Sequence, residues 1–226
     1  MSISTNIQQI THHIPKEVML VAVSKTKPNE LLLEAYQAGQ RHFGENYVQE
    51  LVDKQATLPQ DIHWHFIGHL QSNKAKYIVP FVYLIHSVDS LKLLVEINKQ
   101  AEKIHKTIDC LLQIYIAKEE TKFGFDIQEC EALLQSEAIK TLKNIRIAGL
   151  MGMASNTDNI VQLTTEFNSI KQLFDNIKSK KLVGESFKYL SIGMSSDYPL
   201  AIECGSNMIR VGSHIFGERV YNSPLL

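Results

Sequence analysis

The chain has 226 residues, of which 44% are hydrophobic and 21% are charged, and its formal net charge is -1 at pH 7. These values are typical of a soluble globular protein, and they give no argument for nucleic acid or a membrane surface as a partner. Cys110, Cys130 and Cys204 fit neither a paired disulfide framework nor a metal-binding spacing, so we expect free thiols and a reducing, cytoplasmic location. The sequence shows no signal peptide and no apolar run near the roughly 20 residues of a membrane span.

The first informative stretch in chain order is Val18–Pro28, which follows a polar, helical lead-in over residues 1–17. Six of the seven residues from Val18 to Ser24 are apolar and unbroken, which predicts a strand buried on both faces, as in a parallel sheet. Pro28 then favours the start of a helix. Lys25 therefore lies at the carboxyl end of a buried strand, where α/β proteins bind ligands.

A lysine held against apolar walls favours its neutral amine, which is the nucleophile that forms a Schiff base with an aldehyde. The alternative interpretation of Lys25 is a side chain at a strand end that simply extends its amine to solvent.

Strand and helix patterns alternate along the rest of the chain. The predicted strands are 18–24, 41–43, 63–67, 83–87, 109–117, 145–151, 189–192 and 208–211, and the predicted helices include 29–38, a segment ending at 57, 73–79, a segment beginning at 89, 126–137, 159–180, 197–203 and a short terminal helix. Such alternation predicts an α/β protein with a parallel sheet, and eight repeats close most naturally into a single-domain (β/α)8 TIM-like barrel over residues 1–226. An open doubly wound sheet is the alternative.

The carboxyl ends of the predicted strands give the candidate site. They carry Lys25, Glu45, Asn46, His69, Asp89, Met151, Ser195, Ser196, Gly212 and Ser213. Barrels often bind a phosphate between the loops that follow the seventh and eighth strands. Serine hydroxyls and backbone N–H groups after glycine suit an anion there, although serines also commonly cap helices. Together with Lys25, these two loops favour a ligand with an aldehyde and a phosphate.

Arg210 precedes Gly212 by two residues, so both side-chain positions face the same side of a strand. In a barrel mouth, Arg210 would reach an acceptor such as a ring nitrogen and would keep a pyridine nitrogen unprotonated. That arrangement weakens the electron-sink chemistry of a protonated pyridoxal ring. A structural ion pair with Glu203 or Glu218 is the alternative.

Histidines cluster around the third predicted strand. His63 and His65 share a strand face, and His69 follows. Zinc binding would need a further ligand at suitable spacing, which the sequence does not offer, so we expect no metal site and assign these residues to barrel packing and polar contacts.

Between residues 22 and 219 the chain resembles the pyridoxal phosphate homeostasis protein family, on the segments AVSKTKP, HFGENYVQE, HFIGHLQSNK, KFGF, GLM, LSIGMSSD and IRVGSHIFGER. The resemblance implies a barrel similar to the N-terminal domain of alanine racemases, with pyridoxal 5′-phosphate (PLP) bound as a Schiff base on Lys25. It implies that Ser195 or Ser196, Gly212 and Ser213 hold the phosphate, that Arg210 faces the pyridine nitrogen, and that Asn46 and Met194 line the pocket.

Two positions depart from the family pattern. His214 stands where the family commonly has a small residue such as threonine or alanine, which puts one hydroxyl at the phosphate in doubt. The GLM segment continues as Gly152-Met153-Ala154, a variable stretch that leaves one wall of the pocket undefined.

The resemblance implies a protein that buffers or delivers PLP within vitamin B6 metabolism and has no established turnover. Racemisation needs a second acid or base, which alanine racemases take from a second domain of a partner subunit, and this chain ends at Leu226. A small PLP-dependent amino-acid racemase is the main alternative, and a class I aldolase-type barrel is a remote one. The expected partners are PLP and PLP-dependent apoenzymes as recipients, and we expect a monomer, with a dimer as the alternative.

Overall fold

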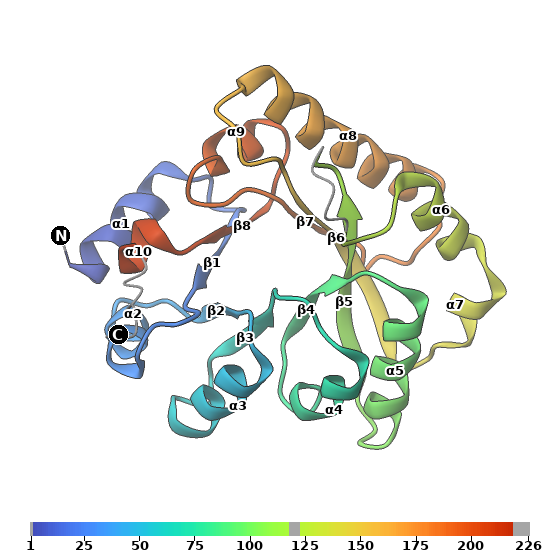
Figure 1. The fold of residues 1–226 in the computed structure, drawn as a ribbon, viewed down its shortest axis with the longest axis horizontal. Coiled ribbons are helices and arrows are strands. Elements are labelled where there is room, and N and C mark those ends of the chain that lie inside the picture. The colour runs from blue at the N-terminus through green and yellow to red at the C-terminus, as the bar shows by residue number, and fades with distance from the viewer. Residues whose placement is uncertain (1, 118–122, 219–226) are drawn as a thin grey trace, which may run out of the picture.

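The computed structural model describes residues 2–117 and 123–218, which form an α/β structure around a closed barrel of parallel strands (Figure 1). The strands follow one another around the barrel in chain order, and the last pairs with the first. They are β1 (Met19–Val23), β2 (His42–Glu45), β3 (His63–Phe66), β4 (Leu84–Val88), β5 (Ile108–Tyr115), β6 (Ile145–Met153), β7 (Tyr189–Ser191) and β8 (Met208–Val211). The predicted (β/α)8 barrel is confirmed, and the open sheet is wrong.

Helices surround the barrel in Figure 1. They are α1 (Ile3–His13), α2 (Asn29–Gln37), α3 (Val48–Thr57), the short 3-10 helix η1 (Ser72–Lys74), α4 (Ala75–Ile78), α5 (Leu91–Glu102), α6 (Ile127–Gln135), α7 (Glu137–Thr141), α8 (Ile160–Ser179), α9 (Tyr198–Glu203) and α10 (Ser213–Phe216). The lead-in helix α1 packs against α2 and α10. The connection between the predicted strand 109–117 and the predicted helix 126–137 includes residues 118–122, which lie outside the described part of the chain.

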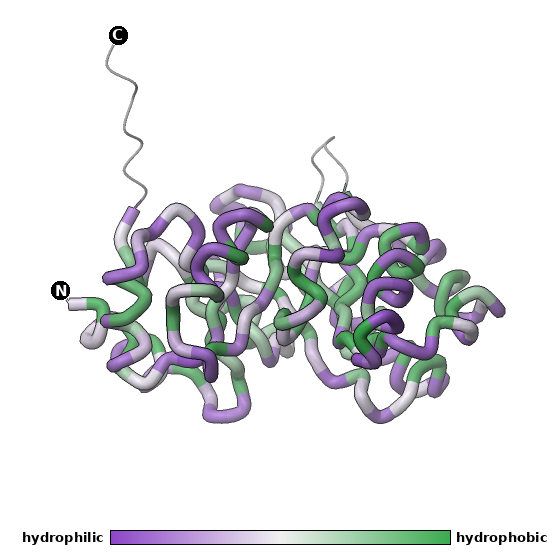
Figure 2. The backbone as a smooth tube through the Cα atoms, turned by 90° about the horizontal axis from the view of Figure 1, so that it is seen from below, coloured by the Kyte–Doolittle hydropathy of each residue, from purple (hydrophilic) through white to green (hydrophobic). Residues whose placement is uncertain are grey.

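The outer helices are amphipathic, and hydrophobic and hydrophilic residues alternate along their turns in Figure 2. In α8, Leu163, Phe167 and Ile170 are buried at helical spacing, as expected for a helix that covers a barrel. The apolar spacing of the sequence places Ile160 in the same stripe, but it is 67% exposed. It is the first residue of the helix, whose buried side chains begin at Leu163.

One predicted helix is divided in the structure. Residues 126–137 were expected to be continuous, but Ser136 has an extended backbone and separates α6 from α7. Its hydroxyl accepts a hydrogen bond from the N–H of Ile139 and so begins the second helix, which is the role that makes serine a frequent N-cap.

The barrel interior combines a small apolar cluster with a polar column. The apolar cluster contains Val21, Leu84, Leu111, Ala148, Met151 and Met208. The larger core lies between the barrel and the helices, where Cys110 and Cys130 are buried as free thiols. Met151 was predicted to end its strand, but β6 continues to Met153, so Met151 packs inside the barrel and Met153 reaches the rim.

Candidate functional site

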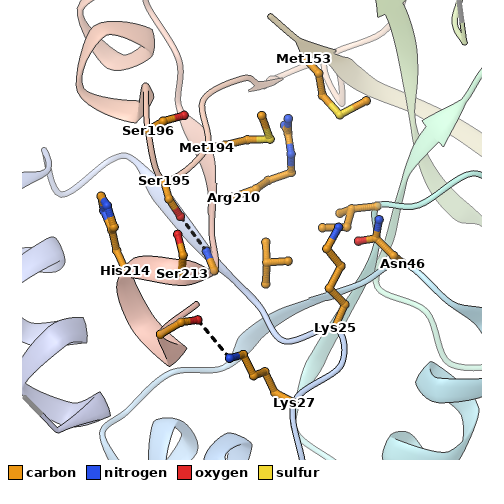
Figure 3. A pocket seen from close by; sticks show the side chains of 14 residues that line it. Lys25, Lys27, Asn46, Met153, Met194, Ser195, Ser196, Arg210, Ser213 and His214 are labelled. Carbon is orange, nitrogen blue, oxygen red and sulfur yellow. Dashed lines mark hydrogen bonds between the residues drawn. The ribbon is translucent and has the colours of Figure 1, made fainter. Parts of the chain in front are cut away.

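A pocket of about 360 Å³ opens at the carboxyl ends of the strands, between the segments that follow β1, β2, β7 and β8. Its lining contains every residue that the sequence predicted to bind the ligand, namely Lys25, Asn46, Met194, Ser195, Ser196, Arg210, Gly212 and Ser213. Lys25 and Asn46 lie on one side of the pocket, Ser195 and Ser213 lie on the other, and Arg210 and Met194 lie between them (Figure 3). The fold thus brings an amine, hydroxyls and a guanidinium to one cavity.

Lys25 is half-buried and stands in the turn between β1 and α2. The residue after it, Thr26, has a φ of 61°, in the left-handed region that a β-branched residue seldom adopts. Ser24 on the other side is fully buried. The Lys25 side chain is therefore presented to the pocket by a turn whose backbone is tightly constrained.

Asn46 follows β2 and contributes an unpaired polar atom. Its Oδ1 is buried and has no hydrogen-bond partner among the described residues. Its backbone packs against Gly68, where an added Cβ would approach the Asn46 carbonyl oxygen to 2.2 Å. Because an unpaired buried amide costs free energy, a polar group of a ligand placed here would be stabilising.

The loops after β7 and β8 are joined to each other through Ser195. Its hydroxyl accepts a hydrogen bond from the N–H of Gly212 at 3.2 Å. In the first loop, Asp197 accepts a hydrogen bond from the N–H of Met194 at 2.6 Å and stands at the N-cap of α9. Ser195 and Ser196 therefore do not have the capping role that was weighed for them, and Ser196 and Ser213 are exposed toward solvent.

Arg210 is only 4% exposed and points into the base of the pocket from β8. Its Nη1 donates to the carbonyl oxygen and to the hydroxyl of Ser191, both at 2.7 Å, and Nη2 donates to the Gly152 carbonyl oxygen at 3.0 Å. These contacts replace the alternative ion pair with Glu203 or Glu218, which are both exposed. Burial lowers the pKa of Arg210 to about 10, which leaves the guanidinium charged near neutral pH.

A column of histidines runs through the barrel and reaches Arg210 by way of Ser191. Ring nitrogens of His42 and His65 are 2.9 Å apart, those of His65 and His86 are 2.8 Å apart, and Nδ1 of His86 lies 3.1 Å from the Ser191 hydroxyl. Burial lowers the pKa of His42 to about 4 and holds the pKa values of His65 and His86 well below the usual range, with Arg210 adding to the effect on His86.

The sequence interpretation had recognised only part of this column. It noted that His63 and His65 share a strand face, but it did not connect them with His42 on β2 or His86 on β4. All four occupy inward-facing strand positions, so the shared register of parallel neighbours was the available signal.

Four strand-end candidates do not line the pocket, namely Glu45, His69, Asp89 and Met151, which packs inside the barrel. Glu45 points to α3 and is fully buried, while His69 pairs with Asp89 at 3.1 Å outside the pocket lining. Four further lining residues had not been connected with the site from the sequence, namely Val23, Lys27, Ile67 and Gly217, while Met153 and His214, which were noted from the sequence as departures from the family pattern, also line it. Lys27 donates to the carbonyl oxygens of residues 216, 217 and 218 and so holds the end of α10 against the β1–α2 turn (Figure 3).

The described residues also bear on a metal site and on a membrane span. They contain no group of three or more His, Cys, Asp or Glu side chains arranged to hold a metal ion. Over residues 2–117 and 123–218, no helix has the length and apolar character needed to cross a membrane.

Comparison with known proteins adds an independent observation. Residues 1–220 match the family model described as "Alanine racemase, N-terminal domain". A pyridoxal phosphate homeostasis protein of Haemophilus influenzae is 41% identical over 209 residues, covering 91% of this chain and 87% of the relative.

Solved structures agree with the fold. PipY of Synechococcus elongatus PCC7942, solved with PLP bound, superposes with a TM-score of 0.85 at 35% identity over 96% of this chain and 100% of that chain. Its structure without PLP gives a TM-score of 0.89 at 36% identity and the same coverage. An alanine racemase of Clostridium difficile 630 shares the fold alone, with a TM-score of 0.76 at 14% identity, and this chain spans 57% of its length.

Proposed function

Since this chain belongs to the alanine racemase N-terminal-domain family and, within it, to the pyridoxal phosphate homeostasis proteins, we propose that it binds PLP through a Schiff base on Lys25 and holds or delivers that cofactor. The observation that carries the proposal is the pocket itself. It places the Lys25 amine opposite the hydroxyls of Ser195 and Ser213, as a ligand with an aldehyde and a phosphate requires. Its volume of about 360 Å³ lies in the lower part of the usual range for small-molecule sites.

Each wall of the pocket suits one part of PLP. The amine of Lys25 is the group that would condense with the aldehyde, with release of water. Ser195 or Ser196, Gly212 and Ser213 would hold the phosphate through hydroxyl and backbone N–H groups. At Gly212 an added Cβ would come within 3.1 Å of the Val23 carbonyl oxygen, so glycine keeps this turn close to β1.

Arg210 suits the pyridine ring. The contacts to Ser191 and Gly152 leave donor capacity on Nε and Nη2, so the guanidinium can donate to a ring nitrogen while staying fixed. A permanent positive charge at that place disfavours protonation of the ring nitrogen. Bound PLP acts as an electron sink mainly when that nitrogen is protonated, so this arrangement supports storage over turnover. Asn46 and Met194 would complete the walls.

The absence of turnover is part of the same proposal. The side chains of Met153 and Met194 in the lining carry no group that exchanges a proton, and the Lys27 amine donates to backbone carbonyl oxygens. His214 lies beside Ser213, on the side of the pocket opposite Lys25, where the phosphate would bind (Figure 3). This lining supports a carrier that transfers PLP to PLP-dependent apoenzymes, and a carrier role is consistent with the relatives' name, pyridoxal phosphate homeostasis protein. The free thiols Cys110, Cys130 and Cys204 support a reducing, cytoplasmic location as part of the proposal.

A small amino-acid racemase is the second candidate, because the fold is shared with alanine racemases. Incubation of PLP-loaded protein with a panel of L-amino acids in deuterated water separates the two candidates. The carrier predicts no deuterium at Cα and no D-enantiomer, whereas incorporation of deuterium would show catalytic proton exchange.

Titration of the purified protein with PLP, followed by absorbance, tests the binding proposal. The wild-type protein is expected to develop the long-wavelength band of a protonated Schiff base, and Lys25→Ala is expected to lack it. Lys16→Ala changes an exposed lysine just before β1 and serves as the matched control, with an unchanged band. A wild-type protein that stays colourless with excess PLP would contradict the proposal.

A further inference from the structure

A buried ion cluster under the β1–α2 turn forms hydrogen bonds with the residues directly before and after Lys25. Lys54 and Glu50 come from α3, and Glu45 comes from the end of β2. We propose that Lys54, acting with Glu45 and Glu50, is the positioning residue that sets the Lys25 amine for reaction with the PLP aldehyde. This inference rests on the proposed function and concerns how its anchor is held.

The contacts reach the residue before Lys25. The Ser24 hydroxyl donates to Oε1 of Glu45 at 2.6 Å, and the Lys54 ammonium donates to the Ser24 carbonyl oxygen at 2.8 Å. The backbone N–H of Ser24 donates to the Gly44 carbonyl oxygen at 3.0 Å, so Ser24 is fixed at its main chain and its side chain.

The contacts also reach the residue after Lys25. The backbone N–H of Thr26 donates to Oε1 of Glu50 at 2.6 Å. Thr26 has a φ of 61°, and a residue in that strained region persists only where its surroundings hold it. The Glu50 carboxylate is the group that holds it here.

Lys54 connects the contacts at Ser24 with the contact at Thr26. Its ammonium donates to Oε1 of Glu45 and to Oε1 of Glu50, both at 2.7 Å, in addition to the Ser24 carbonyl oxygen. An ammonium has three hydrogens to donate, and these three acceptors use them all. The side chains of Lys54 and Glu45 are 6% and 0% exposed, so water does not replace the contacts.

Stability alone is a weak explanation for such a cluster. Burying charges is costly, and Glu45 keeps its second oxygen, Oε2, buried without a hydrogen-bond partner. A well-packed apolar group at α3 would avoid that cost. Unlike an apolar group, the cluster fixes the backbone directly before and after Lys25.

The test measures two events on the same protein. Stopped-flow absorbance gives the rate of Schiff-base formation with PLP, and titration with pyridoxine 5′-phosphate gives the affinity for the ring and phosphate without an aldehyde. In Lys54→Met we expect Schiff-base formation to slow by about tenfold or more, because small misplacements of a reacting group are costly. We expect the affinity for pyridoxine 5′-phosphate to stay within about twofold of wild type.

A second pair of variants covers the case in which Lys54→Met does not fold. Glu50→Ala removes the acceptor of the Thr26 N–H at a position that is 23% exposed, whereas Glu50→Gln keeps an oxygen there. We expect Glu50→Ala to slow Schiff-base formation and Glu50→Gln to restore most of the rate. Lys171→Met, which removes a half-buried lysine paired with Asp175 on α8, is the control and should match wild type.

Three outcomes are decisive. Wild-type rates in Lys54→Met or in Glu50→Ala, with a normal PLP band, would overturn the positioning role. An equal loss in the rate of Schiff-base formation and in the affinity for pyridoxine 5′-phosphate would also overturn it, because that pattern indicates general disruption of the pocket. A wild-type protein that forms no band at all would instead contradict the proposed function.

Discussion

At the scale of single residues, Gly193 controls the shape of the loop that carries Met194, Ser195 and Ser196. It has a φ of 96°, a conformation that glycine adopts readily and other residues do not. An added Cβ would also come within 2.7 Å of the Ala201 Cβ and 3.0 Å of the Tyr198 Cα. Both the backbone angle and the lack of space therefore require glycine.

Gly193→Ala is expected to lower the free energy of unfolding by about 1–3 kcal/mol and to weaken PLP binding, because strain and contact both displace the loop. Urea denaturation and PLP titration measure the two effects. Gly184→Ala is the matched control, since an added Cβ there meets nothing within 4 Å, and it should change the free energy by less than about 0.5 kcal/mol. Equal behaviour of the two variants would contradict this view of the loop.

Sequence patterns identified the pocket residues that end strands at the rim, such as Lys25 and Gly212, because a strand end is visible as a change from apolar to polar residues. They placed Glu45 among these residues, but the side chain points outward to Lys54. Successive side chains of a strand point to opposite faces, so an error of one residue in the predicted strand reverses the predicted direction of a side chain. Lys54 itself carries no signal, because a lysine on an amphipathic helix is ordinarily solvated.

At the scale of elements, the histidine column links β2, β3, β4 and β7 and has one direction of hydrogen bonding. The Ser191 hydroxyl accepts from Arg210, so its own hydrogen is available for Nδ1 of His86. His86 then donates from Nε2 to Nδ1 of His65, and His65 donates from Nε2 to Nδ1 of His42. The positive guanidinium thus favours neutral imidazoles with the proton on Nε2 throughout.

Nitrogen-15 NMR of the histidine side chains tests this arrangement. His65 and His86 are expected to show the neutral tautomer protonated at Nε2, with shifts that stay constant from about pH 6 to pH 8 because their pKa values are depressed. The exposed His12 of α1 provides an internal comparison in the same spectra. Titration of His65 or His86 in that range, or protonation at Nδ1, would show that the column is organised differently.

Element positions followed from hydrophobic periodicity for nearly all strands and helices, because a parallel barrel buries whole strands and one stripe of each helix. The division at Ser136 was missed since the apolar spacing continues across it. A serine N-cap in the middle of a helical pattern is visible only as a local hydrogen bond, which periodicity does not report.

At the scale of the whole molecule, the buried histidines make stability depend on pH. His65 and His86 have depressed pKa values in the folded protein, so below about pH 6.5 the unfolded chain binds protons that the folded chain does not. Each group therefore contributes stability that is present at higher pH and is lost on acidification. Glu45 acts in the opposite direction, because burial raises its pKa to about 7 and the folded form binds the proton more tightly.

Three histidines, His65, His86 and the half-buried His42, take up protons on unfolding, whereas Glu45 alone acts in the opposite direction. We therefore expect the free energy of unfolding to fall as the pH is lowered from about 7 to about 5. Each of His65 and His86 contributes at most about 1.4 kcal/mol per pH unit below pH 6.5. Urea denaturation at several pH values measures the slope. Constant or rising stability on acidification would contradict the buried, neutral state of the column.

The closed barrel was predictable from eight alternations of strand and helix, and it sets where the site lies, because all strand ends meet at one rim. The polar column through its centre was not predictable in the same way. Parallel strands in a barrel usually fill the interior with apolar side chains, so histidines on separate strands indicate a column only when the register of the neighbouring strands is known. We retain as a proposal that residues 1–226 act as one domain.

Reduction of the PLP-loaded protein with borohydride, followed by peptide mapping, tests the central claim most directly. Borohydride converts a Schiff base into a stable amine, so the modified peptide identifies the anchoring residue. The structure predicts a single pyridoxyl phosphate adduct on Lys25, within the peptide that joins β1 to α2. An adduct spread over surface lysines, or one on Lys27 with Lys25 unmodified, would contradict the account.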